Sequence, residues 1–126
     1  MKSLARFSLF AFLAAVAHAQ VGANILITDT WAQGSGPAAT SMTFLRGTSP
    51  TGPFTVTVGS TPVNGSGNYT FVDKPSATNV LVGGTTYYYV AYVSLGSQQS
   101  ANSAVSNGVL YPLALAAPGV PVAAPQ

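Results

Sequence analysis

The chain has 126 residues, of which only 5% are charged, and its formal net charge is +2 at neutral pH. It contains no cysteine, which excludes disulfides and cysteine-based metal or catalytic sites, and its single histidine is His18. Nucleic-acid-binding proteins carry a basic patch, and most enzymes use His, Cys or Glu for proton transfer or nucleophilic attack, so this composition argues against both classes. Beyond Ala19 the charged side chains are Asp29, Arg46, Asp73 and Lys74.

The segment Met1–Ala19 has the pattern of a secretory signal peptide. Two basic residues open it, Phe7–Ala17 is apolar, and Ala17-His18-Ala19 fits the small-x-small cleavage pattern, with Ala15–Ala17 as a weaker second site. The apolar stretch is shorter than the roughly 20 residues that span a bilayer, which argues against the alternative of a retained membrane anchor. We therefore expect cleavage before Gln20, secretion, and no membrane span in the mature chain.

The stretch from residue 20 to residue 111 is predicted to form one all-β domain. β-Branched and aromatic residues dominate it, no stretch keeps a helical period, and pieces rich in Gly, Pro, Ser and Asn separate the runs. Short strands at this spacing are typical of a β-sandwich of about six to seven strands. Asn64-Gly65 is expected to form a tight hairpin turn. The expected strands are Asn24–Trp31, Ser41–Arg46, Phe54–Val58, Asn68–Val72, Thr85–Ser94 and Asn107–Tyr111.

The strand Thr85–Ser94 has apolar or aromatic side chains on both faces, as a central strand does. One face is expected to join the core, while Tyr88 and Tyr92 lie on the other. These two tyrosines allow two interpretations: cross-strand packing, or an exposed aromatic strip that stacks on sugars or on another subunit. The expected core residues are Trp31, Phe44, Leu81, Tyr87 and Tyr89.

The tail Pro112–Gln126 is apolar and repeatedly broken by proline. Proline excludes a continuous helix or a central strand. The tail is therefore either an extended linker or frayed terminus, or a peptide that docks on a neighbouring molecule as an added edge strand. Its candidate interaction residues are Leu113, Leu115 and Val120.

Three stretches carry a resemblance to a known family: Leu45–Phe54 reads LRGTSPTGPF, Leu81–Val90 reads LVGGTTYYYV, and Ser103–Val109 reads SAVSNGV. In this order, and with Trp31 before them, they resemble the fibronectin type III domains of secreted bacterial proteins, from about residue 24 to residue 111. The resemblance implies an immunoglobulin-like sandwich at a bacterial cell surface. It also implies that Trp31 is a core residue and that Tyr87 forms a tyrosine corner, locking the loop before its strand.

The chain departs from that family at two places. Only Gln20–Ala23 precede the strand that starts at Asn24, so the family's first strand is nearly missing and one sheet edge is expected to be unpaired. A strand from a neighbour, or the chain's own tail, would fill this gap. In addition, strict alternation puts Asp29 inside, where a lone carboxylate is costly. Either a bulge near Thr28 rotates Asp29 outward, or it pairs with Arg46 or backbone donors; we expect the bulge.

No catalytic, cofactor or metal site is predicted. Glycosidases need two carboxylates at a set separation, and nothing in the sequence brings Asp29 and Asp73 to one groove. A calcium site needs about six oxygen ligands, and no acidic cluster supplies them. The sequons at Asn64 and Asn68 would matter only in a eukaryotic secretory route.

Two functions therefore remain open. The first is a structural subunit that self-assembles at the cell surface or in extracellular matrix, as a filament, sheath or similar, through the open sheet edge and the tail. The charged side chains beyond Ala19 sum to a net charge of zero. This favours self-assembly, because little repulsion keeps the copies apart. The second is an adhesive or binding module for a polysaccharide or a cell-surface protein, using loops or the Tyr88 and Tyr92 strip. We expect the first.

Overall fold

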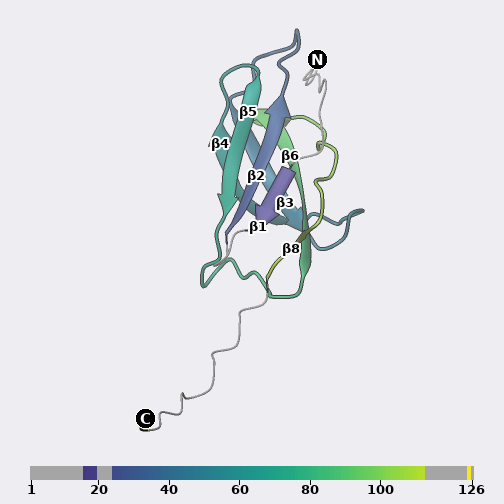
Figure 1. Cartoon of the computed structure of the whole chain (residues 1–126). Coiled ribbons are helices and arrows are strands. Elements are labelled where there is room, and N and C mark those ends of the chain that lie inside the picture. Colours follow the sequence, from purple (N-terminus) through teal and green to yellow (C-terminus); the bar gives the residue numbers. More distant parts are fainter. Residues whose placement is uncertain (1–15, 20–23, 113–124, 126) are drawn as a thin grey trace.

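The computed structural model describes residues 16–19, 24–112 and 125. In these ranges there is no helix, and antiparallel strands form two sheets that pack face to face as a β-sandwich (Figure 1). The predicted all-β, immunoglobulin-like sandwich is thereby confirmed. The first sheet has the order β1-β2-β5, made of Val16–Ala19, Ile25–Trp31 and Gly67–Asp73.

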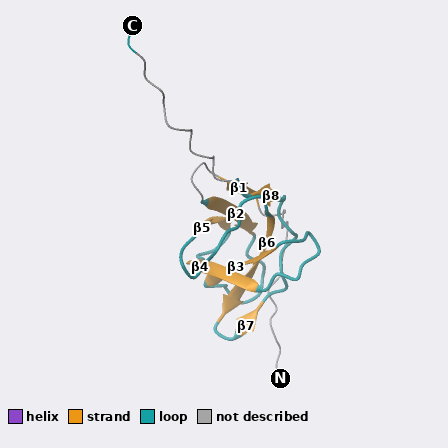
Figure 2. Cartoon of the chain, turned by 90° about the horizontal axis from the view of Figure 1, so that it is seen from below, coloured by secondary structure: helices purple, strands orange, loops and turns teal. Residues whose placement is uncertain are grey.

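The second sheet has the order β4-β3-β6, and the short strands β7 and β8 each pair with β6. Figure 2 looks along the sandwich and shows the two layers side by side. The bounds of these strands are Val56–Pro62 for β4, Ser41–Gly47 for β3, Thr86–Leu95 for β6, Gln98–Gln99 for β7 and Val109–Leu110 for β8.

The core lies between the sheets because apolar residues alternate with polar ones along the strands. In β2 every second residue from Ile25 to Trp31 is buried, and its neighbours are half-buried. The opposing sheet contributes alternate residues of β3 and β6, among them Phe44 and Tyr89. The largest fully buried apolar side chains are Trp31, Tyr89, Phe44, Ile25, Ile27, Met42 and Val93.

Strand β4 differs from its expected range of Phe54–Val58, because it continues through Gly59 to Pro62. The register with β3 shifts between Phe44 and Leu45, opposite Gly59. A Cβ on Gly59 would lie 2.1 Å from the ring of Phe71, which stacks on Phe44 with ring centroids 5.8 Å apart. The glycine is therefore not a strand end but the place where a ring lies on the backbone.

The expected hairpin turn at Asn64-Gly65 is wrong. β4 and β5 belong to different sheets, so this segment carries the chain from one layer to the other. The hydroxyl of Tyr69 holds the crossing, since it accepts the Asn64 backbone N–H at 2.9 Å and donates to the Gly65 carbonyl at 2.7 Å. Strand β5 pairs instead with β2 along its whole length.

The first strand, which is expected to be nearly missing after cleavage, is present in the full chain. Val16–Ala19 forms β1 and pairs with Ile25–Thr28 of β2, from Ala19 opposite Ile25 to Val16 opposite Thr28. Figure 1 shows β1 beside β2 at the edge of the first sheet. The strand consists of residues inside the predicted signal peptide. Cleavage before Gln20 would therefore remove it.

Candidate functional site

The edge of β6 is sealed by three serines that we call the serine ladder: Ser100, Ser103 and Ser106. Their backbone N–H groups donate to the carbonyls of Val93, Ala91 and Tyr89 at 2.9, 2.7 and 2.9 Å. Each serine Oγ accepts the N–H of that same β6 residue at 3.0 Å. Serines that are three residues apart thus pair with β6 residues that are two residues apart. The edge is therefore hydrogen-bonded although no regular strand lies beside it.

Sequence reasoning did not find this ladder. The signal is the serine at every third position from Ser100 to Ser106. The pattern is easily read as loop composition, because serine is common in turns.

The edge of the other sheet, on β2, is protected differently. The four residues that β1 covers, Ile25–Thr28, are what we call the acceptor edge. Strand pairing on this side stops at Thr28, whereas the pairing of β2 with β5 continues to Trp31. The acceptor edge carries no charged side chain. Loss of β1 would therefore expose a short, uncharged row of backbone donors and acceptors.

Asp29 lies just beyond the acceptor edge and is only 2% exposed. The expected bulge near Thr28 is wrong, because β2 pairs with β5 in continuous register through this point. The expected alternative of pairing with Arg46 is also wrong, because Arg46 pairs with Asp73, whereas pairing with backbone donors is met for one carboxylate oxygen. The Thr30 N–H donates to Asp29 Oδ1 at 2.8 Å, while Oδ2 has no hydrogen-bond partner within the described residues.

The surroundings of Asp29 favour its neutral form. Burial raises the pKa of the Asp29 carboxyl to about 6, and the hydrogen bond from Thr30 and the nearby Ser103 hydroxyl lower the pKa by less. The Ser103 hydroxyl donates its hydrogen to the Ala104 carbonyl at 2.9 Å, so it does not compensate the carboxylate charge fully.

Asp73 is also buried, but it is held in a polar cluster. Its Oδ2 accepts hydrogen bonds from Arg46 at 2.8 Å and from the Tyr89 hydroxyl at 2.6 Å. Its Oδ1 accepts from the Asn79 amide at 2.8 Å. Arg46 also lies 5.2 Å from the centroid of the Tyr87 ring. Burial, together with the hydrogen bond to Asp73, raises the pKa of Tyr89.

The two carboxylates do not form a catalytic pair. Asp73 is opposite Ile25 in the β2–β5 pairing, four positions along β2 from Asp29. At about 3.3 Å per residue this places them roughly 13 Å apart along the strands, beyond the separations of about 5–10 Å that glycosidases use.

The predicted core residues Trp31, Phe44, Leu81, Tyr87 and Tyr89 are all buried. The Tyr87 hydroxyl accepts the backbone N–H of Val82 at 2.8 Å and so fixes the loop before β6. This is the hydrogen bond that the resemblance to fibronectin type III domains implies for Tyr87.

The candidate interaction residues lie in two places. Tyr88 and Tyr92 are half-buried on the outer face of β6, and an added Cβ on Gly108 would come within 2.9 Å of the Tyr88 ring. Tyr88 therefore packs partly on the domain itself rather than standing free. The tail candidates Leu113, Leu115 and Val120 lie outside the described residues.

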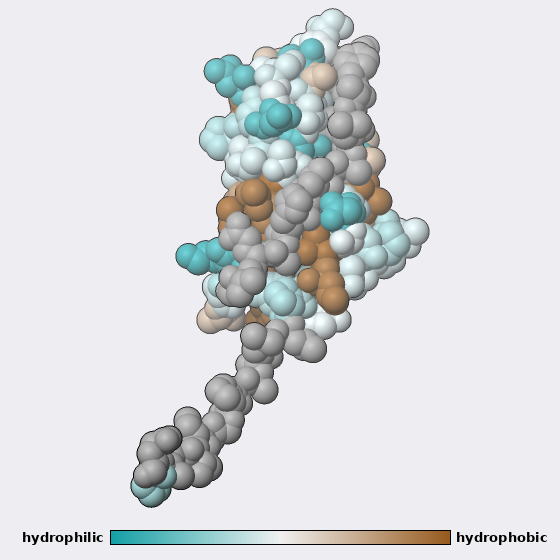
Figure 3. Space-filling model, viewed as in Figure 1, coloured by the Kyte–Doolittle hydropathy of each residue, from teal (hydrophilic) through white to brown (hydrophobic). Residues whose placement is uncertain are grey.

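Exposed hydrophobic side chains gather at one end of the sandwich, which we call the apolar end. Val72 lies opposite Leu26 at the start of β2, and Val56 lies opposite Arg46 at the start of β4. Leu110 lies opposite Thr86, at the start of β6. Figure 3, in the same view as Figure 1, shows hydrophobic surface on the lower half of the domain. The apolar end consists of Val56, Val72, Val80, Val82 and Leu110.

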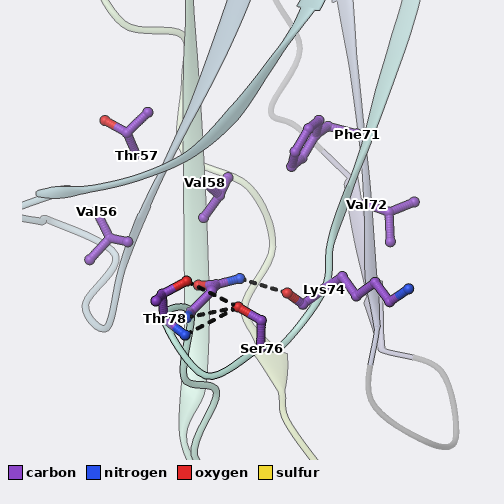
Figure 4. Close-up of a pocket in the computed structure, with 9 residues that line it drawn as sticks. Val56, Thr57, Val58, Phe71, Val72, Lys74, Ser76 and Thr78 are labelled. Atoms are coloured by element: carbon purple, nitrogen blue, oxygen red, sulfur yellow. Dashed lines mark hydrogen bonds between the residues drawn. The ribbon is translucent and has the colours of Figure 1, made fainter.

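A shallow groove of about 410 Å³ lies between β4 and β5, the two strands that face each other across the sheets (Figure 4). Its wall combines the apolar side chains of Val58 and Phe71 with the hydroxyls of Ser76 and Thr78. The Lys74 side chain points away from the Ser76–Thr78 turn (Figure 4). The full lining is Val56, Thr57, Val58, Phe71, Val72, Lys74, Ser76, Thr78 and Asn79.

No protein-family model, curated protein or solved structure matches this chain. The resemblance to fibronectin type III domains therefore stays a prediction. Within residues 16–19 and 24–112, no three His, Asp or Glu side chains gather as a metal site would require. Across the same part of the chain, no helix has the length and apolar character needed to cross a membrane.

Proposed function

We propose that this protein is a secreted, non-catalytic domain of the fibronectin type III kind that self-assembles as a structural subunit. The assembly would be a filament, sheath or similar structure at the cell surface or in extracellular matrix. The observation that carries the proposal is the unequal protection of two neighbouring sheet edges, those of β6 and β2. The serine ladder closes β6 from within the domain, whereas β1, within the predicted signal peptide, closes β2.

Several physical features support association of the mature chain. An unpaired strand edge is a template for pairing with another chain, and natural proteins normally cover or charge such edges. The acceptor edge has no charge, and the formal charges of the chain beyond Ala19 sum to zero. Little repulsion would therefore oppose contact between copies. The apolar end offers further surface whose burial would be favourable.

The chemistry of the described residues supports a non-catalytic role. Asp73 is already engaged by Arg46, Tyr89 and Asn79, so its carboxylate serves the fold. Asp29 is buried away from solvent and cannot reach a substrate without opening the sandwich.

The proposal is tested with the purified chain Gln20–Gln126 at neutral pH. Light scattering and negative-stain electron microscopy should show ordered polymers. A monodisperse monomer at high concentration would contradict self-assembly. Amorphous aggregates without a repeating unit would contradict a structural role.

The groove between β4 and β5 favours a second candidate, an extracellular binding module for a polysaccharide or protein partner. Hydroxyl and amide groups beside apolar side chains are the kind of surface that binds sugars or an extended peptide. Deletion of Pro112–Gln126 separates the two candidates. Ligand binding at this groove would survive the deletion, whereas assembly that depends on the tail would be lost.

A further inference from the structure

We propose that the acceptor edge vacated by β1 is filled by Leu113–Ala117 of a second copy of this chain. This inference rests on the proposed self-assembly and names the two segments that make the contact. It also assigns a role to the residues of β1, which close the edge until the predicted cleavage removes them.

The acceptor edge favours a particular kind of strand. Ile25 and Ile27 face the core and are fully buried, while Leu26 and Thr28 face outward and are half-buried. Without β1, the backbone donors and acceptors of this edge face solvent, and such a row of groups is a template for another strand. A short, uncharged segment with free backbone N–H groups would match this edge in length and in charge.

The tail contains one segment of that kind. Leu113–Ala117 is its longest stretch without proline, bounded by Pro112 and Pro118. Because proline cannot donate to a strand ladder, pairing is confined to this stretch. It has five residues and β1 has four, and large Leu alternates with small Ala as a strand with two different faces requires.

The position where the tail starts favours a neighbour over the same chain. Strand β8 contacts β1, so the tail begins beside the acceptor edge. Tyr111 is still anchored, since its N–H donates to Thr85 at 2.8 Å and its carbonyl accepts from Gly84 at 2.9 Å. To pair with the acceptor edge of its own domain, the tail would have to turn back on itself, and a tight turn needs about two residues. Only Pro112 separates Tyr111 from Leu113. A segment from another copy has no such restriction.

The consequence is a head-to-tail contact, because each copy offers one tail and one acceptor edge. Such contacts close into rings or continue as filaments, depending on the rotation between neighbours. Val72 of the apolar end lies opposite Leu26 on the acceptor edge, so the neighbour would cover apolar surface next to the paired strand.

Cysteine cross-linking tests the contact directly, since the natural chain has no cysteine. One variant of Gln20–Gln126 carries Leu26→Cys, and a second set carries a single cysteine at each position from 113 to 117. We expect a mixture to form covalent heterodimers at one or two of these positions, with at least tenfold less product elsewhere. A variant with both cysteines that closes only an internal disulfide would overturn the inference in favour of the chain's own tail.

A proline substitution separates this inference from the proposed function. Leu115→Pro removes a backbone donor from the middle of the predicted donor strand, and Ala123→Pro is the matched control in the same tail. We expect the first variant to stay monomeric and folded, and the second to assemble like the natural sequence. Polymers that survive Leu115→Pro would overturn the inference while leaving self-assembly standing. Absence of polymers in every chain, including the natural one, would refute both.

Discussion

Asn in place of Asp29 should make this protein more stable at neutral pH, although it removes a charge from the core. Burial raises the pKa of Asp29 from 3.8 to about 6, a difference of about 2 pH units. At about 1.36 kcal/mol per unit, ionisation of Asp29 costs the folded state about 3 kcal/mol at pH 7. Asp29→Asn avoids this cost and can keep the hydrogen bond from the Thr30 N–H through its amide oxygen.

The pH dependence has a definite sign. Between about pH 4 and pH 6 the folded protein holds the Asp29 proton more tightly than the unfolded chain does. The free energy of unfolding of the natural sequence therefore falls as pH rises through this window. The advantage of Asp29→Asn should be near zero at pH 4 and reach about 3 kcal/mol above pH 6, which is a rise in Tm of about 10 °C or more.

Urea unfolding at each pH, followed by the fluorescence of Trp31, measures this difference. Trp31 is the single tryptophan and is fully buried, so its emission reports the core. The natural chain and its variant are compared over the same residues, so that position 29 is their single difference. Equal stability of Asp29→Asn and the natural sequence at pH 7 would refute the reasoning, as would a natural stability that does not change between pH 4 and pH 7.

Three further substitutions test the packing. Asp73→Asn leaves the Arg46 guanidinium as a buried charge without its carboxylate, so we expect a loss of about 3 kcal/mol or more in urea unfolding, opposite in sign to Asp29→Asn. Gly59→Ala forces the Phe71 ring from its place and should cost about 1–3 kcal/mol by the same assay; Gly67→Ala, with its nearest neighbour 3.8 Å away, should cost far less. Ser106→Ala leaves the buried Tyr89 N–H without the Oγ acceptor, so we expect faster hydrogen exchange at that amide and a loss of about 1–3 kcal/mol, and an unchanged exchange rate would argue against the ladder.

The parts of the fold that follow a simple period could be predicted from the sequence. Alternation in β2 and β6 identifies the inward faces, because a half-buried strand repeats every two residues. The end of β4 could not be predicted, since Gly59 reads as a break unless the ring of Phe71 above it is known. Asn64-Gly65 likewise has the composition of a hairpin, and only the pairing of β5 with β2 makes it a crossing.

The candidate site was predicted less completely. An unpaired first edge follows from the few residues between the predicted cleavage and β2. The sequence does not predict that Val16–Ala19 covers this edge in the full chain, because the same residues fit a cleavage pattern. The serine ladder was missed because a period of three matches neither helix nor strand. A bulge at Asp29 is the expectation from sequence, because burial of a lone carboxylate is costly. The fold instead buries Asp29 and raises its pKa.

The central claim is that four residues of the predicted signal peptide decide whether the copies associate. It is tested most directly by sedimentation velocity on two chains that differ only in their start, one at Val16 and one at Gln20. The account predicts that the chain from Val16 keeps β1 and sediments as a monomer, while the chain from Gln20 forms ordered polymers. Equal association of the two chains, or none in either, would contradict it.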